Sequence, residues 1–89
     1  MDRSPLTQVR EALGLSRTDA AATLGVSYRA LWGAEHAGEP IPPAARQALG
    51  ELGVDVAQLE REQAEWFAER AAQLRQDLRA RIAQEAVPA

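Results

Sequence analysis

The side chains best suited to chemistry gather in one short stretch, residues 27–33. Tyr28 and Trp32 are four residues apart, so on a helix they share a face with Arg29. A guanidinium group matches the O6 and N7 acceptors of guanine, and a thymine methyl rests well against an aromatic ring. Exposed Tyr, Trp and Arg are also the usual residues of a protein-binding hot spot. The stretch therefore favours binding, either to DNA or to another protein.

The sequence offers nothing around which a reaction or a metal site is built. It has one histidine, His36, and no cysteine, and it lacks a Gly-rich phosphate loop or a convergent pair of carboxylates. A lone histidine without cysteine does not suit structural zinc. We therefore expect no enzyme activity, no bound metal and no cofactor.

The elements that carry these residues are two short helices joined by a tight corner. Ser16 and Ser27 each stand where a helix should begin, and a serine there accepts a hydrogen bond from a free backbone amide. Gly25 can adopt the positive φ that ends the first of the two helices. Ala21 is small enough for the second helix to pack closely. This layout is typical of a helix-turn-helix, whose second helix enters the DNA major groove.

The rest of the chain predicts an all-α fold, in which a compact helix-turn-helix domain of four to five helices precedes a long C-terminal amphipathic helix. We expect the domain over residues 1–56 and the long helix, with a dimerisation role, over 57–89. Helix-forming patterns and their stop signals give helices over residues 5–13, 17–24, 28–36, 44–52 and 56–86. The predicted core is Leu6, Val9, Leu13, Ala20, Ala21, Leu24, Leu31, Ala34, Ala45, Ala48, Leu49, Leu52, Val56 and Leu59.

Apolar residues along the long helix recur at alternating spacings of three and four. This heptad-like seam of about two repeats favours self-association into a two-fold homodimer. The alternative is that the helix folds back along its own domain. The residues that we expect in the dimer interface are Phe67, Ala71, Leu74, Leu78 and Ile82.

Composition limits the partners. The chain has 89 residues and a net charge of −3, and all ten of its basic residues are arginine. An acidic balance disfavours strong nonspecific binding to DNA. No apolar run approaches the roughly 20 residues that span a membrane, and the first residues do not resemble a signal peptide. We expect a cytoplasmic protein without a membrane partner.

Several short motifs resemble the Cro and lambda-repressor type of helix-turn-helix, the xenobiotic-response-element family. The resemblance covers about residues 6–56 and includes Leu31 and Glu35. Its other elements are Leu15-Ser16 before the first helix of the pair, Leu24-Gly25-Val26-Ser27 at the turn, and Leu52-Gly53-Val54-Asp55 after the fourth helix. The resemblance implies the fold and double-stranded DNA as a partner.

Positions that contact DNA in that family carry over to six residues here. Arg29 is the best candidate for reading a base, while Arg17 would hold a phosphate. Trp32 suits the groove, a neighbouring helix or a protein partner. A glycine inside a helix costs about 1 kcal/mol of stability, so Gly33 indicates that a neighbouring helix or DNA approaches the backbone closely there. Glu35 is expected to bond within the domain. The six residues are Arg17, Ser27, Tyr28, Arg29, Trp32 and Gly33.

These observations predict a sequence-specific DNA-binding transcriptional regulator, a repressor-like homodimer on a palindromic site. One alternative is a protein-interaction module on the same scaffold, antitoxin-like or an adaptor, with Tyr28 and Trp32 contacting the partner. A further alternative is a phage packaging or replication component that binds DNA.

Overall fold

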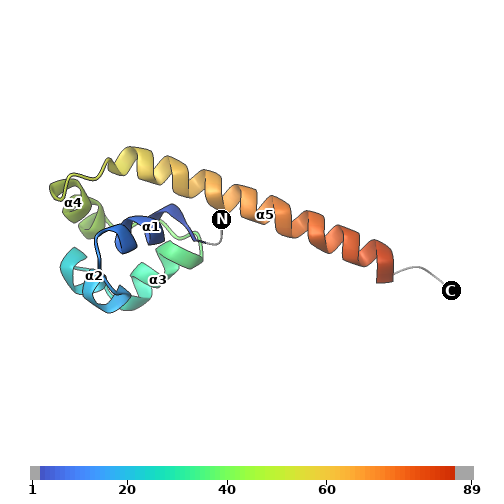
Figure 1. Ribbon diagram of the computed structural model, residues 1–89, viewed down its shortest axis with the longest axis horizontal. Helices are drawn as coiled ribbons and strands as arrows, with labels where there is room; N and C mark the ends of the chain where they lie inside the picture. Colours follow the sequence, from blue (N-terminus) through green and yellow to red (C-terminus); the bar gives the residue numbers. More distant parts are fainter. Residues whose placement is uncertain (1–2, 86–89) are drawn as a thin grey trace.

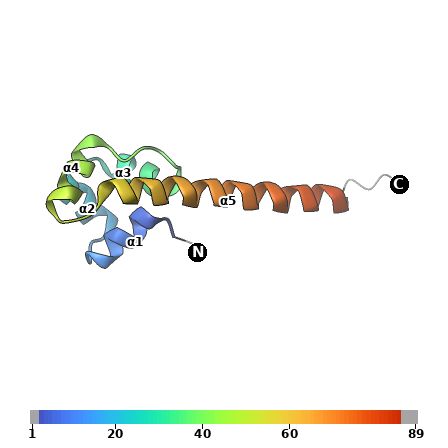
Figure 2. The same cartoon turned by 90° about the horizontal axis from the view of Figure 1, so that it is seen from above.

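The computed structural model describes residues 3–85, which form five α-helices and no strand (Figures 1 and 2). Four short helices make a compact bundle, and the fifth lies across it and extends far to one side. This confirms the all-α prediction, and the bounds of the first four helices and the start of the fifth lie within one residue of those expected. The helices are α1 (Pro5–Ala12), α2 (Arg17–Leu24), α3 (Tyr28–His36), α4 (Pro43–Glu51) and α5 (Val56–Glu85). The predicted end of the last helix, at residue 86, lies outside the described residues.

Serine caps begin the first three helices. The hydroxyl of Ser16 accepts a hydrogen bond from the backbone amide of Asp19 at 3.1 Å, and that of Ser27 from Ala30 at 3.0 Å. Each bond satisfies one of the backbone donors that a helix start leaves free. Between the two helices, Gly25 has φ of +70°, a left-handed conformation that costs other residues energy. Both predicted caps and the predicted corner are therefore confirmed.

The core lies between the short helices and the first turns of α5. Two predicted core positions are wrong, because Leu13 is 40% exposed and Leu52 is 52% exposed. Each is the C-terminal cap of its helix, where the chain already turns away from the buried face. Ile41, in the proline-rich loop before α4, is buried although the sequence did not indicate it. The buried apolar residues are Leu6, Ala20, Ala21, Leu24, Leu31, Ala34, Ile41, Ala45, Leu49 and Leu59.

The two halves of α5 have different surroundings. Its first turns pack on α1 and α4 through Leu59, and Val56 packs at the edge of the core, as predicted. A boundary at residue 56 therefore does not separate α5 from the domain. From residue 72 to residue 85 every position of the helix is exposed, and this half projects from the bundle, which gives the molecule extents of 60 × 23 × 21 Å (Figure 1). The distal half therefore does not fold back along its own domain.

Among residues 3–85, no helix is both long enough and apolar enough to cross a membrane. The same residues hold no group of three or more His, Cys, Asp or Glu side chains that is arranged to bind a metal ion.

Candidate nucleic-acid interface

The first turn of α3 lies on the side of the bundle that faces away from α5 (Figure 1). Tyr28 is 49% exposed there, and Arg29 and the capping Ser27 are also exposed. The side chain of Arg29 makes no hydrogen bond or ion pair with any other residue of 3–85, so its guanidinium is available to a ligand. The long helix therefore leaves this surface uncovered.

Arg17 differs from Arg29, because its guanidinium is already bonded within the domain. Its Nε donates to Oε1 of Glu35 at 3.4 Å, and another of its nitrogens donates to the Tyr28 hydroxyl at 3.3 Å. A third nitrogen lies 3.1 Å from Nε2 of His36. The hydrogen bond to Tyr28, together with the nearby charge of Glu35, raises the pKa of Arg17 above its ordinary value. Arg17 thus stays charged and orients Tyr28, and its side chain is only 25% exposed.

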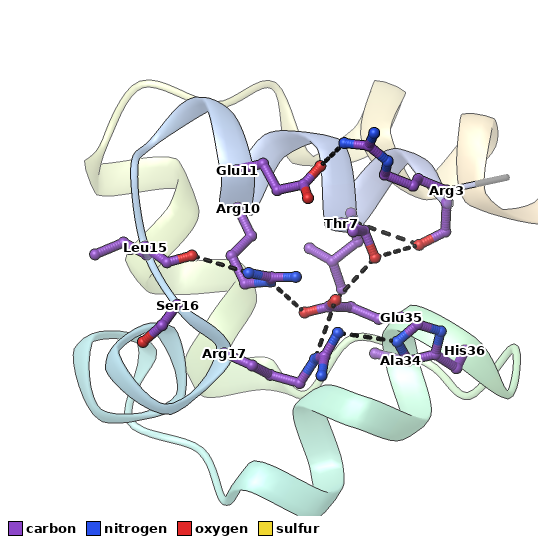
Figure 3. A network of polar contacts seen from close by, with 12 residues as sticks. Arg3, Thr7, Arg10, Glu11, Leu15, Ser16, Arg17, Ala34, Glu35 and His36 are labelled. Carbon is purple, nitrogen blue, oxygen red and sulfur yellow. Dashed lines mark hydrogen bonds and ion pairs between the residues drawn. The ribbon is translucent and has the colours of Figure 1, made fainter. Parts of the chain in front are cut away.

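Glu35 is fully buried and connects three helices (Figure 3). Its Oε1 also accepts a hydrogen bond from the Thr7 hydroxyl at 2.8 Å, and its Oε2 accepts one from Nε of Arg10 at 3.0 Å. Arg10 in turn donates to the backbone oxygen of Leu15 at 2.9 Å, at the corner between α1 and α2. A buried carboxylate needs partners of this kind, because an unpaired charge in the interior is costly. The expectation that Glu35 bonds within the domain is confirmed.

Trp32 and Gly33 occupy opposite situations in the middle of α3. Trp32 is 47% exposed and lies one turn after Tyr28, so it adds an apolar surface beside that residue. Its ring lies 5.1 Å from that of His36. Gly33 is buried, and a methyl group at this position would meet the carboxylate of Glu39. The group that closely approaches Gly33 is therefore the side chain of Glu39, rather than a neighbouring helix. Gly33 therefore does not lie on the exposed face, which corrects its placement among the groove-facing residues.

Sequence reasoning missed Gln63, a buried polar residue of α5. Its Oε1 accepts a hydrogen bond from the backbone amide of Leu6 at 2.8 Å, and its Nε2 donates to the backbone oxygen of Ala34 at 2.9 Å. One side chain thus satisfies a free donor at the start of α1 and an acceptor in the last turn of α3. These contacts join residues 57 and 29 positions apart in the sequence, so no local sequence pattern predicts them.

The five predicted interface residues of α5 divide into two groups. Phe67 and Ala71 are partly buried, and the ring of Phe67 approaches the loop at Gly38. Leu74 and Leu78 are each 52% exposed and Ile82 is 61% exposed, and within residues 3–85 none of the three packs against the core. A shallow groove continues this exposed stripe toward the domain. Its lining is Gly38, Glu39, Pro40, Ile41, Glu60, Gln63, Ala64 and Phe67.

The fold and this surface define an all-α helix-turn-helix domain with a projecting C-terminal helix. Comparison of the chain with protein-family models, curated proteins and solved structures finds no match. The resemblance to the xenobiotic-response-element family therefore stays a prediction from the sequence motifs.

Proposed function

We propose that the chain is a sequence-specific DNA-binding regulator that acts as a homodimer on a palindromic site. The observation that carries the proposal is the exposed first turn of α3, where Tyr28 and the unpartnered Arg29 lie side by side in sequence and clear of α5. The second helix of a helix-turn-helix reads bases through its N-terminal residues.

Each residue of this surface has a specific role in the proposal. Arg29 donates two hydrogen bonds to guanine O6 and N7, a pairing that contributes about 1–3 kcal/mol of discrimination. Tyr28, which Arg17 orients, contacts the phosphate and sugar next to that base. Trp32 rests against a thymine methyl with its exposed ring. Arg17 supports Tyr28 and supplies positive charge near the backbone.

Net charge shapes the expected binding behaviour. With a formal charge of −3, the chain gains little from the sequence-independent attraction to phosphate. Affinity for random DNA is then weak, and the difference between a specific site and random DNA is large. The arginines near α3 provide the local positive charge.

Selection of binding sites from random duplex DNA tests the proposal directly. The expected result is an enriched inverted repeat with half-sites about one helical turn apart. An Arg29→Ala chain, selected in parallel, is the matched control and should lose preference at one or two base pairs in each half-site. Enrichment of no sequence by a folded wild-type chain would reject DNA reading.

A second candidate function is binding to a protein through the same surface. It is favoured by the exposure of Tyr28 and Trp32, at 49% and 47%, together with the acidic net charge. Affinity capture with wild-type and Trp32→Ala chains separates the two functions. A single dominant protein partner that is lost with Trp32→Ala, without retained DNA fragments, would favour the interaction module.

A further inference from the structure

We propose that the second copy of the chain binds with its α5 antiparallel to the first, so that the distal half of each α5 covers the proximal half and the adjoining groove of the other. This inference rests on the proposed homodimer, but it does not rest on DNA binding. It is carried by the charges along α5, by the exposed apolar stripe and by the groove.

The charges of α5 are separated along its length. Residues 60–69 carry four glutamates and one arginine, and residues 70–81 carry four arginines and one aspartate. An antiparallel pair places each acidic half beside a basic half, whereas a parallel pair places like charges side by side. The acidic half comprises Glu60, Glu62, Glu65 and Glu69 with Arg61, and the basic half Arg70, Arg75, Arg79 and Arg81 with Asp77.

The separation is not explained by the helix on its own. The helix dipole favours acids near the start and bases near the end, but its effect falls off within the first and last turns. Here the acidic half extends to Glu69, more than three turns into the helix. Glu65 and Glu69 are four residues apart, as are Arg75 and Arg79, and like charges at this spacing destabilise an isolated helix. Glu65 and Glu69 lie on the side of α5 away from the stripe, so a partner acts on the charge of each half as a whole and, at the stripe itself, through Arg70 and Asp77.

The groove beside the proximal half of α5 suits the distal half of a second copy. Its lining includes the apolar side chains of Ile41, Ala64 and Phe67. Two carboxylates also line it, those of Glu39 and Glu60, the latter 3.8 Å from Arg46. The distal half of the partner supplies complementary groups, namely exposed Leu78 and Ile82 with Arg79 and Arg81 next to them in sequence. The distal half of a second copy therefore offers apolar groups that match this lining and positively charged groups that match its carboxylates.

Antiparallel pairing about a two-fold axis between positions 71 and 74 brings Ala71 opposite Leu74 of the partner, and Phe67 opposite the partner's Leu78. The flanking Arg70 then faces the partner's Asp77. With a rise of about 1.5 Å per residue, the two stretches of α5 that carry Leu59 and Gln63 lie about 35 Å apart. That distance is about one turn of DNA, the spacing of two half-sites.

Both domains also face the same way in this arrangement. With 3.6 residues per turn, the stripe lies roughly a fifth of a turn around α5 from the face of Leu59 and Gln63. A two-fold axis through the stripe therefore leaves the two domains on one side of the helix pair. The first turns of both α3 helices then point away from the pair.

Disulfide mapping tests the orientation, and the natural chain has no cysteine to interfere. Chains with Ala64→Cys or Ile82→Cys, both at exposed positions, are oxidised alone and as a mixture in which one chain carries a mass tag. The antiparallel arrangement predicts a 64–82 linkage between the two different chains, and little linkage in either single-variant sample. Efficient linkage of Ile82→Cys to itself would indicate a parallel pair and overturn the proposal. Light scattering that shows only monomer at high concentration would also overturn it.

A charge-reversal variant provides a second, independent readout. Asp77→Arg makes the two contacts between Arg70 and the partner's Asp77 repulsive, so we expect the antiparallel dimer to dissociate about tenfold more readily. A parallel pair places no charged residue of the partner opposite position 77, so an unchanged dissociation constant would contradict the antiparallel arrangement. The Asp77 side chain makes only an exposed hydrogen bond, which it accepts from Nε2 of Gln73, so the domain fold should be unaffected. All of these measurements are made without DNA, and failure to find a binding site would leave their outcome unchanged.

Discussion

The Nε atom of Arg17, at the start of α2, lies 3.4 Å from Oε1 of Glu35, in the last turn of α3. Through this contact a buried carboxylate holds the guanidinium that in turn bonds to the Tyr28 hydroxyl. The same carboxylate binds Arg10 and Thr7 of α1. The surface proposed to read DNA is therefore fixed by a polar group that no ligand can reach.

Glu35→Gln should strongly destabilise the domain. The substitution keeps the side-chain shape but leaves the partly buried Arg10 and Arg17 without their anionic partner. Breaking a buried ion pair from one side costs about 3 kcal/mol or somewhat more. Urea unfolding measures the loss, and Glu51→Gln, at an exposed position at the end of α4, is the control, with a change within about 0.5 kcal/mol. Equal stability of the two variants would contradict the proposed role of the network.

Arg29→Ala and Arg17→Ala should weaken DNA binding in different ways. Arg29 has no partner within residues 3–85, so its loss leaves stability unchanged and relaxes discrimination at one or two base pairs by about 1–3 kcal/mol. Loss of Arg17 lowers both stability and affinity, because Tyr28 and Glu35 lose a partner. Fluorescence anisotropy on the selected site and its single-base variants, with unfolding curves for both chains, measures the contrast. Identical stability losses for the two variants would refute it.

Gln63→Leu should destabilise the attachment of α5 to the domain. The leucine fits the space but leaves the Leu6 amide and the Ala34 carbonyl buried without partners. Two unsatisfied groups cost about 2–6 kcal/mol in total. Thermal or urea unfolding measures the effect, and Gln76→Leu, at an exposed position on the same helix, is the control. A stability loss no greater than that of the control would show that the two hydrogen bonds contribute little.

Gly25→Ala and Gly50→Ala should change stability in opposite directions. Gly25 has a positive φ, where alanine is strained by about 1 kcal/mol. Gly50 lies inside α4 with no atom near a potential Cβ, so alanine there gains about 0.5–1 kcal/mol from lower backbone entropy. Thermal unfolding curves of both variants, measured against the wild-type chain, give the sign of each change in stability. A stabilised Gly25→Ala chain would exclude the strained corner.

Local chemistry accounts for the parts of the fold that the sequence predicted well. Serine caps, stop signals and apolar periodicity are read over a few residues, which explains why α2 and α3 match the prediction residue for residue. Two misses, Leu13 and Leu52, are local, because a helix cap turns away from the buried face. The others are long-range: Gln63 acquires its partners only when distant helices meet, and the burial of Gly33 depends on the position of Glu39 in the following loop.

The projecting half of α5 has a thermodynamic consequence. Its last turns, residues 72–85, are exposed and gain no tertiary packing from the rest of residues 3–85, and isolated helical segments of this length are marginal in water. In the proposed dimer, ordering of these turns and assembly are a single coupled equilibrium. Dilution would then fray the end of the helix while the capped bundle keeps its shape, so the far-ultraviolet circular dichroism per residue would fall as the protein concentration decreases.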